Sequence, residues 1–142
     1  MSSEDYLIRY FRQLGKVLLA LLGLYEKKEY QQAIDEINQV LDTWFALPVN
    51  EIDKKTPEEL LETILNSEDQ QIEKAKSVAE LLYQKAYALR AMEKTEKAKS
   101  YALKALLLYK KVDEVSGDFS IEIQQKIAEL DQWSGAGSLE NC

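Results

Sequence analysis

The 142-residue chain is long enough for one domain with a core, and its 46% hydrophobic and 30% charged residues are ordinary for a globular protein. Its net charge of −7, with lysines and arginines scattered along it, excludes the basic face that nucleic-acid binding requires. Because there is no histidine and a single cysteine, Cys142, the commonest general base, the commonest zinc ligand and an internal disulfide are excluded. We therefore expect no catalytic residues, no metal and no cofactor.

Two long helices are predicted first. Apolar residues at steps of four and three from Leu7 to Tyr25 predict a helix over Glu4–Lys27. From Val17 onward this helix is apolar nearly all round, so we expect it to be central in the fold or buried against another chain. The run is far shorter than the roughly 20 residues that span a bilayer, and no membrane is expected. The same spacing predicts a helix over Glu29–Ala46, antiparallel to the first.

A linker and a short helix follow. Pro48 ends the second helix, and Val49–Lys55 is predicted to be a linker. Thr56 as N-cap, Pro57 at the first helical position and a glutamate as capping-box partner form a strong start signal. The sequence therefore predicts a short helix over Pro57–Leu65.

The second half of the chain carries two helices rich in alanine. Helical spacing predicts one over Gln70–Met92 and another from Thr95, as its N-cap, to Glu114. Their facing sides are marked by small residues, which let two backbones lie close together: Ala79, Ala86, Ala98, Ala102 and Ala105. Ser116–Asp118 is predicted to contain a C-cap glycine and a new N-cap, and a last helix covers Phe119–Trp133.

Together these elements predict an all-α protein of about six helices arranged in antiparallel hairpins, with no strand. A single domain is expected over residues 1–133. Residues 134–142, rich in glycine and serine, are predicted to be a flexible tail.

The hairpins resemble tetratricopeptide (TPR) units, which stack into a right-handed superhelix. Ala86, Ala98 and Ala105 match the small residues of that family, at its spacings of twelve and seven. The match is partial, because Glu93 stands where glycine marks the turn of the family. The resemblance covers about Leu14–Tyr109 and implies a TPR-like superhelix or bundle that binds a protein or peptide partner.

A second resemblance covers more of the chain. Asp5–Arg9, the leucine-rich helix that contains it and Thr56–Leu61 are similar to a family of bacterial TPR-like proteins known as a domain of unknown function. This resemblance implies a bacterial, cytoplasmic protein with no assigned chemistry.

Tyrosine and arginine supply the candidate partner-binding residues, since both are favoured in interfaces. Tyr83, Tyr87 and Arg90 step by four and three along one side of a helix, and in TPR-like folds such first-helix residues line a concave groove. The alternative is that the tyrosines are half-buried beneath a neighbouring helix. Tyr6 and Arg9 are a second candidate anchor, and the alternative there is an amphipathic helix start with solvated arginines.

The sequence thus predicts a non-catalytic domain that binds another protein or peptide. One alternative is a structural protein that self-associates through its apolar first helix, as a homodimer. The other is a small-ligand binder or an enzyme that uses tyrosine, arginine and carboxylates. For the acidic residues between 50 and 70, a solvated face is favoured over a cation site because no calcium-loop spacing is present.

Overall fold

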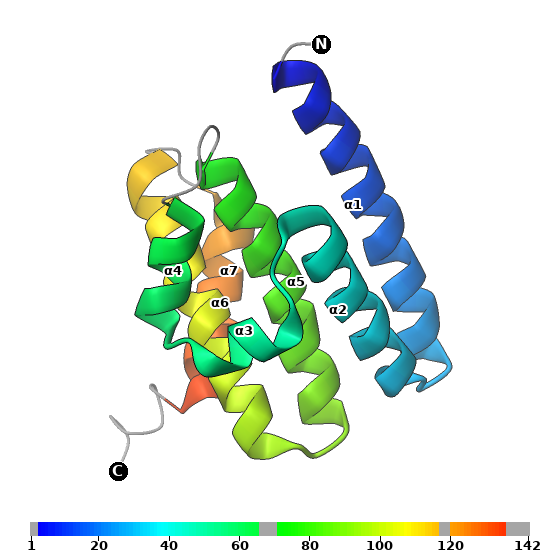
Figure 1. Ribbon diagram of the computed structural model, residues 1–142. Helices are drawn as coiled ribbons and strands as arrows, with labels where there is room; N and C mark the ends of the chain where they lie inside the picture. The colour runs from blue at the N-terminus through cyan, green and yellow to red at the C-terminus, as the bar shows by residue number, and fades with distance from the viewer. Residues whose placement is uncertain (1–2, 66–70, 117–119, 136–142) are drawn as a thin grey trace.

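The part of the chain that the structure describes folds into seven helices without a strand (Figure 1). A computed structural model describes the backbone of residues 3–65, 71–116 and 120–135. Within these ranges it describes the side chains from residue 12 onward, except that of residue 71. The helices are α1 (Ser3–Glu26), α2 (Tyr30–Phe45), α3 (Val49–Lys54), α4 (Pro57–Leu65), α5 (Gln71–Ala91), α6 (Thr95–Ser116) and α7 (Ile121–Ser134). The all-α prediction is confirmed, with one helix more than the six predicted. Over the described ranges, no helix combines the length and apolar content needed to cross a membrane.

Helices α5 and α6 occupy the centre of the fold. Helix α2 packs on α5, α4 packs on both α5 and α6, α7 packs on α6, and α1 lies outside α2. Taken in the order α1, α2, α5, α6, α7, each of these helices runs opposite to the one before it (Figure 1). As a result α1, α5 and α7 share one direction.

Helices α5 and α6 pack on each other, and the alanines predicted to lie on their facing sides are buried. The alanines on the two facing sides are each at most 2% exposed: Ala79, Ala86, Ala98, Ala102 and Ala105. The turn that joins the helices places Glu93 at a φ of 62°, in the left-handed region that favours glycine. Glutamate is therefore accommodated at the position where the TPR family has glycine.

Helix α1 is an edge helix and is not central in the fold, so the alternative that it is buried against another chain stays a prediction. Leu21 is fully buried against the core. Leu19 and Leu22, on another side of the helix, are 69% and 55% exposed. The apolar residues of α1 therefore exceed what α2 and α5 cover.

The segment predicted as a linker, Val49–Lys55, instead contains the short helix α3. Pro48 stands at its N-cap position, and the Ile52 amide donates to the Pro48 carbonyl at 3.1 Å. Ile52 is fully buried, and Asp53 accepts a hydrogen bond of 2.5 Å from the Tyr101 hydroxyl of α6. A helix this short has too little periodicity to be read from sequence, and tertiary contacts hold it.

Helix α4 begins as predicted. The Thr56 amide donates to the Glu59 carboxylate at 3.0 Å, and the Glu59 amide donates to the Thr56 hydroxyl at 3.1 Å. This reciprocal pair is a capping box. The hydrogen bond from the Thr56 amide also lowers the pKa of Glu59.

Two other helix starts differ from the prediction. Thr95 is the first residue of α6 rather than its N-cap, because the Ala98 amide donates to the Lys94 carbonyl at 3.0 Å. Helix α7 is capped by Ser120, whose hydroxyl accepts the amide of the third residue of the helix at 3.3 Å. The caps predicted at residues 117 and 118 lie outside the described residues.

The end of α7 lies beyond the predicted domain boundary at residue 133. Ser134 is the last helical residue, and Gly135 ends the helix with a φ of 84°. The first two residues of the predicted tail therefore form the helix terminus, and residues 136–142 lie outside the part of the chain that is described.

Replacing Ala102 with leucine should lower the free energy of unfolding by about 1–3 kcal/mol, because the added carbons have no room where α6 meets α5. Urea unfolding measures the change. Leu103→Ala, at a neighbouring position that is 41% exposed, is the control and should change the stability by less than about 0.5 kcal/mol. Equal effects of the two variants would contradict close packing at Ala102.

Candidate functional site

Three predicted site residues of α5 lie together, and Trp133 of α7 joins them. The Tyr83 ring stacks on the Trp133 ring, with centroids 5.1 Å apart and planes 26° apart. The guanidinium carbon of Arg90 lies 4.5 Å from the centroid of the same indole, in a cation–π contact. The predicted alternative, a half-buried tyrosine beneath a neighbouring helix, holds for Tyr83, whereas Tyr87 is 39% exposed.

Tyr25 of α1 continues the row of rings on the other side of Tyr87. The centroids of Tyr25 and Tyr87 are 4.8 Å apart, and those of Tyr87 and Trp133 are 6.4 Å apart. The Tyr25 hydroxyl donates to the backbone carbonyl of Gln84 in α5 at 3.1 Å. We call Tyr25, Tyr83, Tyr87 and Trp133 the aromatic row. Ring pairs of this kind contribute about 0.5–1.5 kcal/mol each beyond their buried area, so the row connects α1, α5 and α7.

Two hollows in the surface meet at Tyr87, which lines both. The hollow toward α1 has a volume of about 450 Å³ and is lined by Leu22, Tyr25, Glu26, Tyr83, Gln84 and Tyr87. The hollow toward α7 has a volume of about 650 Å³ and is lined by Tyr87, Arg90, Ala91, Glu93, Thr95, Ala98, Lys99, Gln132 and Trp133. We call these two hollows together the aromatic groove. The residues that line the aromatic groove come from α1, α5, the turn after α5, the start of α6, and α7.

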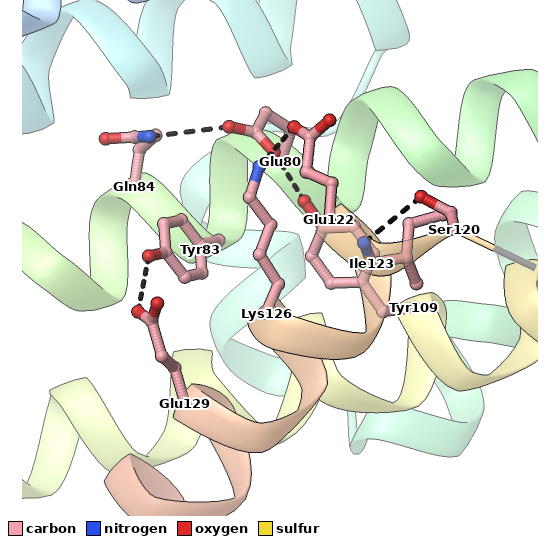
Figure 2. A network of polar contacts seen from close by, with 9 residues as sticks. All are labelled: Glu80, Tyr83, Gln84, Tyr109, Ser120, Glu122, Ile123, Lys126 and Glu129. Atoms are coloured by element: carbon pink, nitrogen blue, oxygen red, sulfur yellow. Dashed lines mark hydrogen bonds and ion pairs between the residues drawn. The ribbon is translucent and has the colours of Figure 1, made fainter.

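A polar network beside the groove joins α5 to α6 and α7 (Figure 2). The Tyr109 hydroxyl donates to the Glu80 carboxylate at 2.5 Å, and the Lys126 ammonium forms an ion pair with the same carboxylate. The Tyr83 hydroxyl donates to the Glu129 carboxylate at 2.6 Å. These contacts hold α7 against α5 and thereby fix the position of the Trp133 wall.

The tyrosines of this network remain donors over the physiological pH range. Burial raises the pKa of Tyr83 and of Tyr109 well above the usual value near 10. Glu129 adds to the rise for Tyr83, and Glu80 adds to the rise for Tyr109, because each carboxylate favours the protonated hydroxyl that donates to it. The network therefore stabilises one arrangement of the three helices.

A second polar cluster lies on another side of α5, and it was not predicted from the sequence. Lys85 is 4% exposed, and its ammonium donates to Asn38 Oδ1 at 2.7 Å and to the Tyr101 hydroxyl at 2.9 Å. The Tyr101 hydroxyl donates in turn to Asp53 of α3. Burial lowers the pKa of Lys85 to about 8. One feature of the sequence could have indicated that Lys85 is buried. It stands four residues before Leu89, on the apolar stripe of the helix.

The remaining predicted anchor, Tyr6 and Arg9, lies in the first turns of α1, where the side chains are outside the described residues. Tyr25 and Trp133 complete the groove, although helical periodicity alone places both on packing faces. Within the ranges that the structure describes, no three His, Cys, Asp or Glu side chains gather as metal ligands do.

Comparison of the chain with protein-family models, with curated proteins and with solved structures finds no match. The resemblances to tetratricopeptide proteins and to a bacterial family therefore stay predictions. The side chains of the aromatic groove, and the helices that place them, provide the grounds on which a function is proposed.

We expect the stability of the protein to rise with pH between about 8 and 10. The pKa of Lys85 is about 8 in the folded chain, against 10.5 for the solvated side chain. In this range the unfolded state holds more protons, so raising the pH favours the folded state. Above about pH 10 the trend reverses, because tyrosines of the unfolded chain ionise while Tyr83 and Tyr109 stay protonated. Urea unfolding in phosphate-free buffer measures both trends.

Lys85→Met is the control for this titration. The rise in stability between pH 8 and 10 should be smaller in the variant. A part of the rise should remain, because burial also lowers the pKa of Lys104. The fall at higher pH should stay, because the tyrosines are unchanged. An undiminished rise in the variant would show that Lys85 is not the titrating group.

Proposed function

We propose that this chain is a TPR-like, non-catalytic domain that binds a segment of another protein in the aromatic groove. The observation that carries the proposal is the aromatic row, presented between α1 and α7, with Arg90 over the Trp133 ring. Tyrosine, tryptophan and arginine dominate the energetics of protein interfaces, because each buries a large area and keeps a polar group for hydrogen bonding.

The arrangement of the helices supports this proposal. The hairpins α1–α2 and α5–α6 have matching turns, with Lys28 and Glu93 at left-handed φ angles of 60° and 62°. In each turn the following amide donates back to the helix at 2.9 Å. In TPR-like folds the first helix of each hairpin lines the concave groove. Here α1, α5 and α7 line the aromatic groove together with the start of α6.

Exposure at the groove also supports a binding role. Tyr87 is 39% exposed at the junction of the two hollows, and Leu22 on the α1 wall is 55% exposed. A partner that covers these side chains gains about 25 cal/mol for each Å² of apolar area removed from water. Charged groups of both signs border the hollows, with Glu26 toward α1 and Arg90 toward α7. These charges would orient a bound segment that carries complementary charges.

Photo-crosslinking in the native cell tests the proposal. A benzoylphenylalanine at position 87 should capture a discrete partner, because the side chain lies between the two hollows. The same amino acid at position 103, where Leu103 is similarly exposed on α6, is the matched control and should not capture that partner. Capture at 103 and not at 87 would place the interface away from the groove.

With the captured partner purified, Tyr87→Ala combined with Arg90→Ala should weaken binding by about thirtyfold or more, as expected for the loss of a hot spot of about 2 kcal/mol. The fold should survive, since both side chains are exposed. Calorimetry measures the affinity, and an unchanged dissociation constant would refute the proposed site.

A second candidate function, self-association through α1, is favoured by Leu19 and Leu22, which are 69% and 55% exposed. If α1 pairs with a second copy, sedimentation velocity should show a dimer whose fraction rises with concentration. Leu19→Glu should then return the protein to a monomer, because a charge at a buried interface is costly. A wild-type monomer at every concentration would eliminate this candidate.

A further inference from the structure

A small hollow of about 160 Å³ lies among α2, α3, α5 and the start of α6. Lys85 lines it from α5, two residues away from both Tyr83 and Tyr87 and therefore about 200° around the helix from each. No residue that lines this hollow also lines the aromatic groove. We call it the lysine hollow, and a ligand bound in it would be independent of the peptide proposed for the groove.

The residues that line the lysine hollow carry a net positive charge, although the chain as a whole has a net charge of −7. Its lining includes three ammonium groups, from Lys85, Lys94 and Lys97, and one carboxylate, from Asp53. With all four groups charged, the hollow carries two positive charges in excess. Burial lowers the pKa of Lys85, Asp53 partly opposes this effect, and the nearby charge of Lys97 adds to it.

Two lysine side chains in this region are buried. Lys85 and Lys104 are 4% and 3% exposed, and their ammonium nitrogens lie 4.1 and 5.1 Å from the centroid of the Tyr101 ring. Buried charges are costly unless an opposite charge compensates them. Among the described residues, Asp53 is the one carboxylate that lines the hollow, so an anion held there would offset the charges of Lys94 and Lys97 at the exposed rim.

The hollow also contains a donor that is free to bind a ligand. An ammonium group has three N–H donors, and those of Lys85 that are used go to Asn38 and Tyr101. The third has no hydrogen-bond partner among the residues that the structure describes. Lys94 and Lys97 stand at the start of α6, where the helix dipole adds positive potential. Glu96 of the same turn does not line the hollow.

We propose that the lysine hollow binds a small tetrahedral oxyanion, either inorganic phosphate or the phosphoryl end of a small phosphomonoester. The hollow, of about 160 Å³, has room for the five heavy atoms of a phosphate. A phosphoryl group carries between about −1.5 and −2 charges at neutral pH, which matches the excess positive charge of the hollow. The anion takes the third donor of Lys85 and lies toward Lys94 and Lys97, away from Asp53.

Titration of the full chain with inorganic phosphate at neutral pH tests the proposal, with sodium chloride used to keep the ionic strength constant. Amide NMR shifts should saturate and centre on Asn38, Lys85, Lys97 and Tyr101, and the melting temperature should rise. Lys97→Met, at an exposed position on the rim, keeps the fold and should weaken phosphate binding about tenfold, the loss of one charge-assisted contact. Lys85→Met, checked for folding by circular dichroism, should abolish binding.

Lys110→Met is the matched control, since it removes the same charge from a side chain that is 53% exposed and does not line the hollow. It should leave the phosphate affinity unchanged. Equal losses in the Lys97 and Lys110 variants, or the absence of saturable shifts, would overturn the proposal. Glycerol phosphate separates the two sources: binding as tight as that of phosphate supports a phosphomonoester ligand, and binding of phosphate alone supports the free ion.

Discussion

The positions of the other helices depend on the packing of α5 on α6, two helices that carry alanines at most 2% exposed. A small side chain at each crossing point lets the two backbones approach closely. Helices α2 and α4 then pack on α5, and α7 packs on α6 (Figure 1). If α5 moved along α6, both the aromatic groove and the lysine hollow would change shape, because residues of α5 and α6 line both.

Helix α5 serves two surfaces that differ in chemistry. One side presents Tyr83 and Tyr87 to α1 and α7, and another side places Lys85 among α2, α3 and α6. A helix surrounded by neighbours has no simple division into an apolar and a polar face. Its polar residues are instead accommodated one at a time by partners on the adjacent helices. This is why one central helix can supply an aromatic binding surface and a buried ammonium group.

Tyrosine hydroxyls fix how the helices are placed relative to one another. Tyr25 bonds α1 to α5, Tyr83 bonds α5 to α7, Tyr101 bonds α6 to α3, and Tyr109 bonds α6 to α5. Each ring adds apolar packing, and each hydroxyl finds its acceptor in one arrangement only. A shifted helix would lose these hydrogen bonds, each of which contributes about 0.5–1.5 kcal/mol. These bonds therefore select a single packing among those that the alanines permit.

The sequence by itself determined the long helices, the capping box at Thr56 and the buried alanines, because periodicity and capping act between residues at most four positions apart. It also placed Tyr83, Tyr87 and Arg90 on one side of a helix. Only the tertiary structure decided the rest. Helix α3, the Trp133 wall and the Lys85 cluster rely on partners some 50 residues away, as in the bonds from Lys85 to Asn38 and from Tyr101 to Asp53. Contacts at such separations arise from the packing of whole helices, which no local pattern encodes.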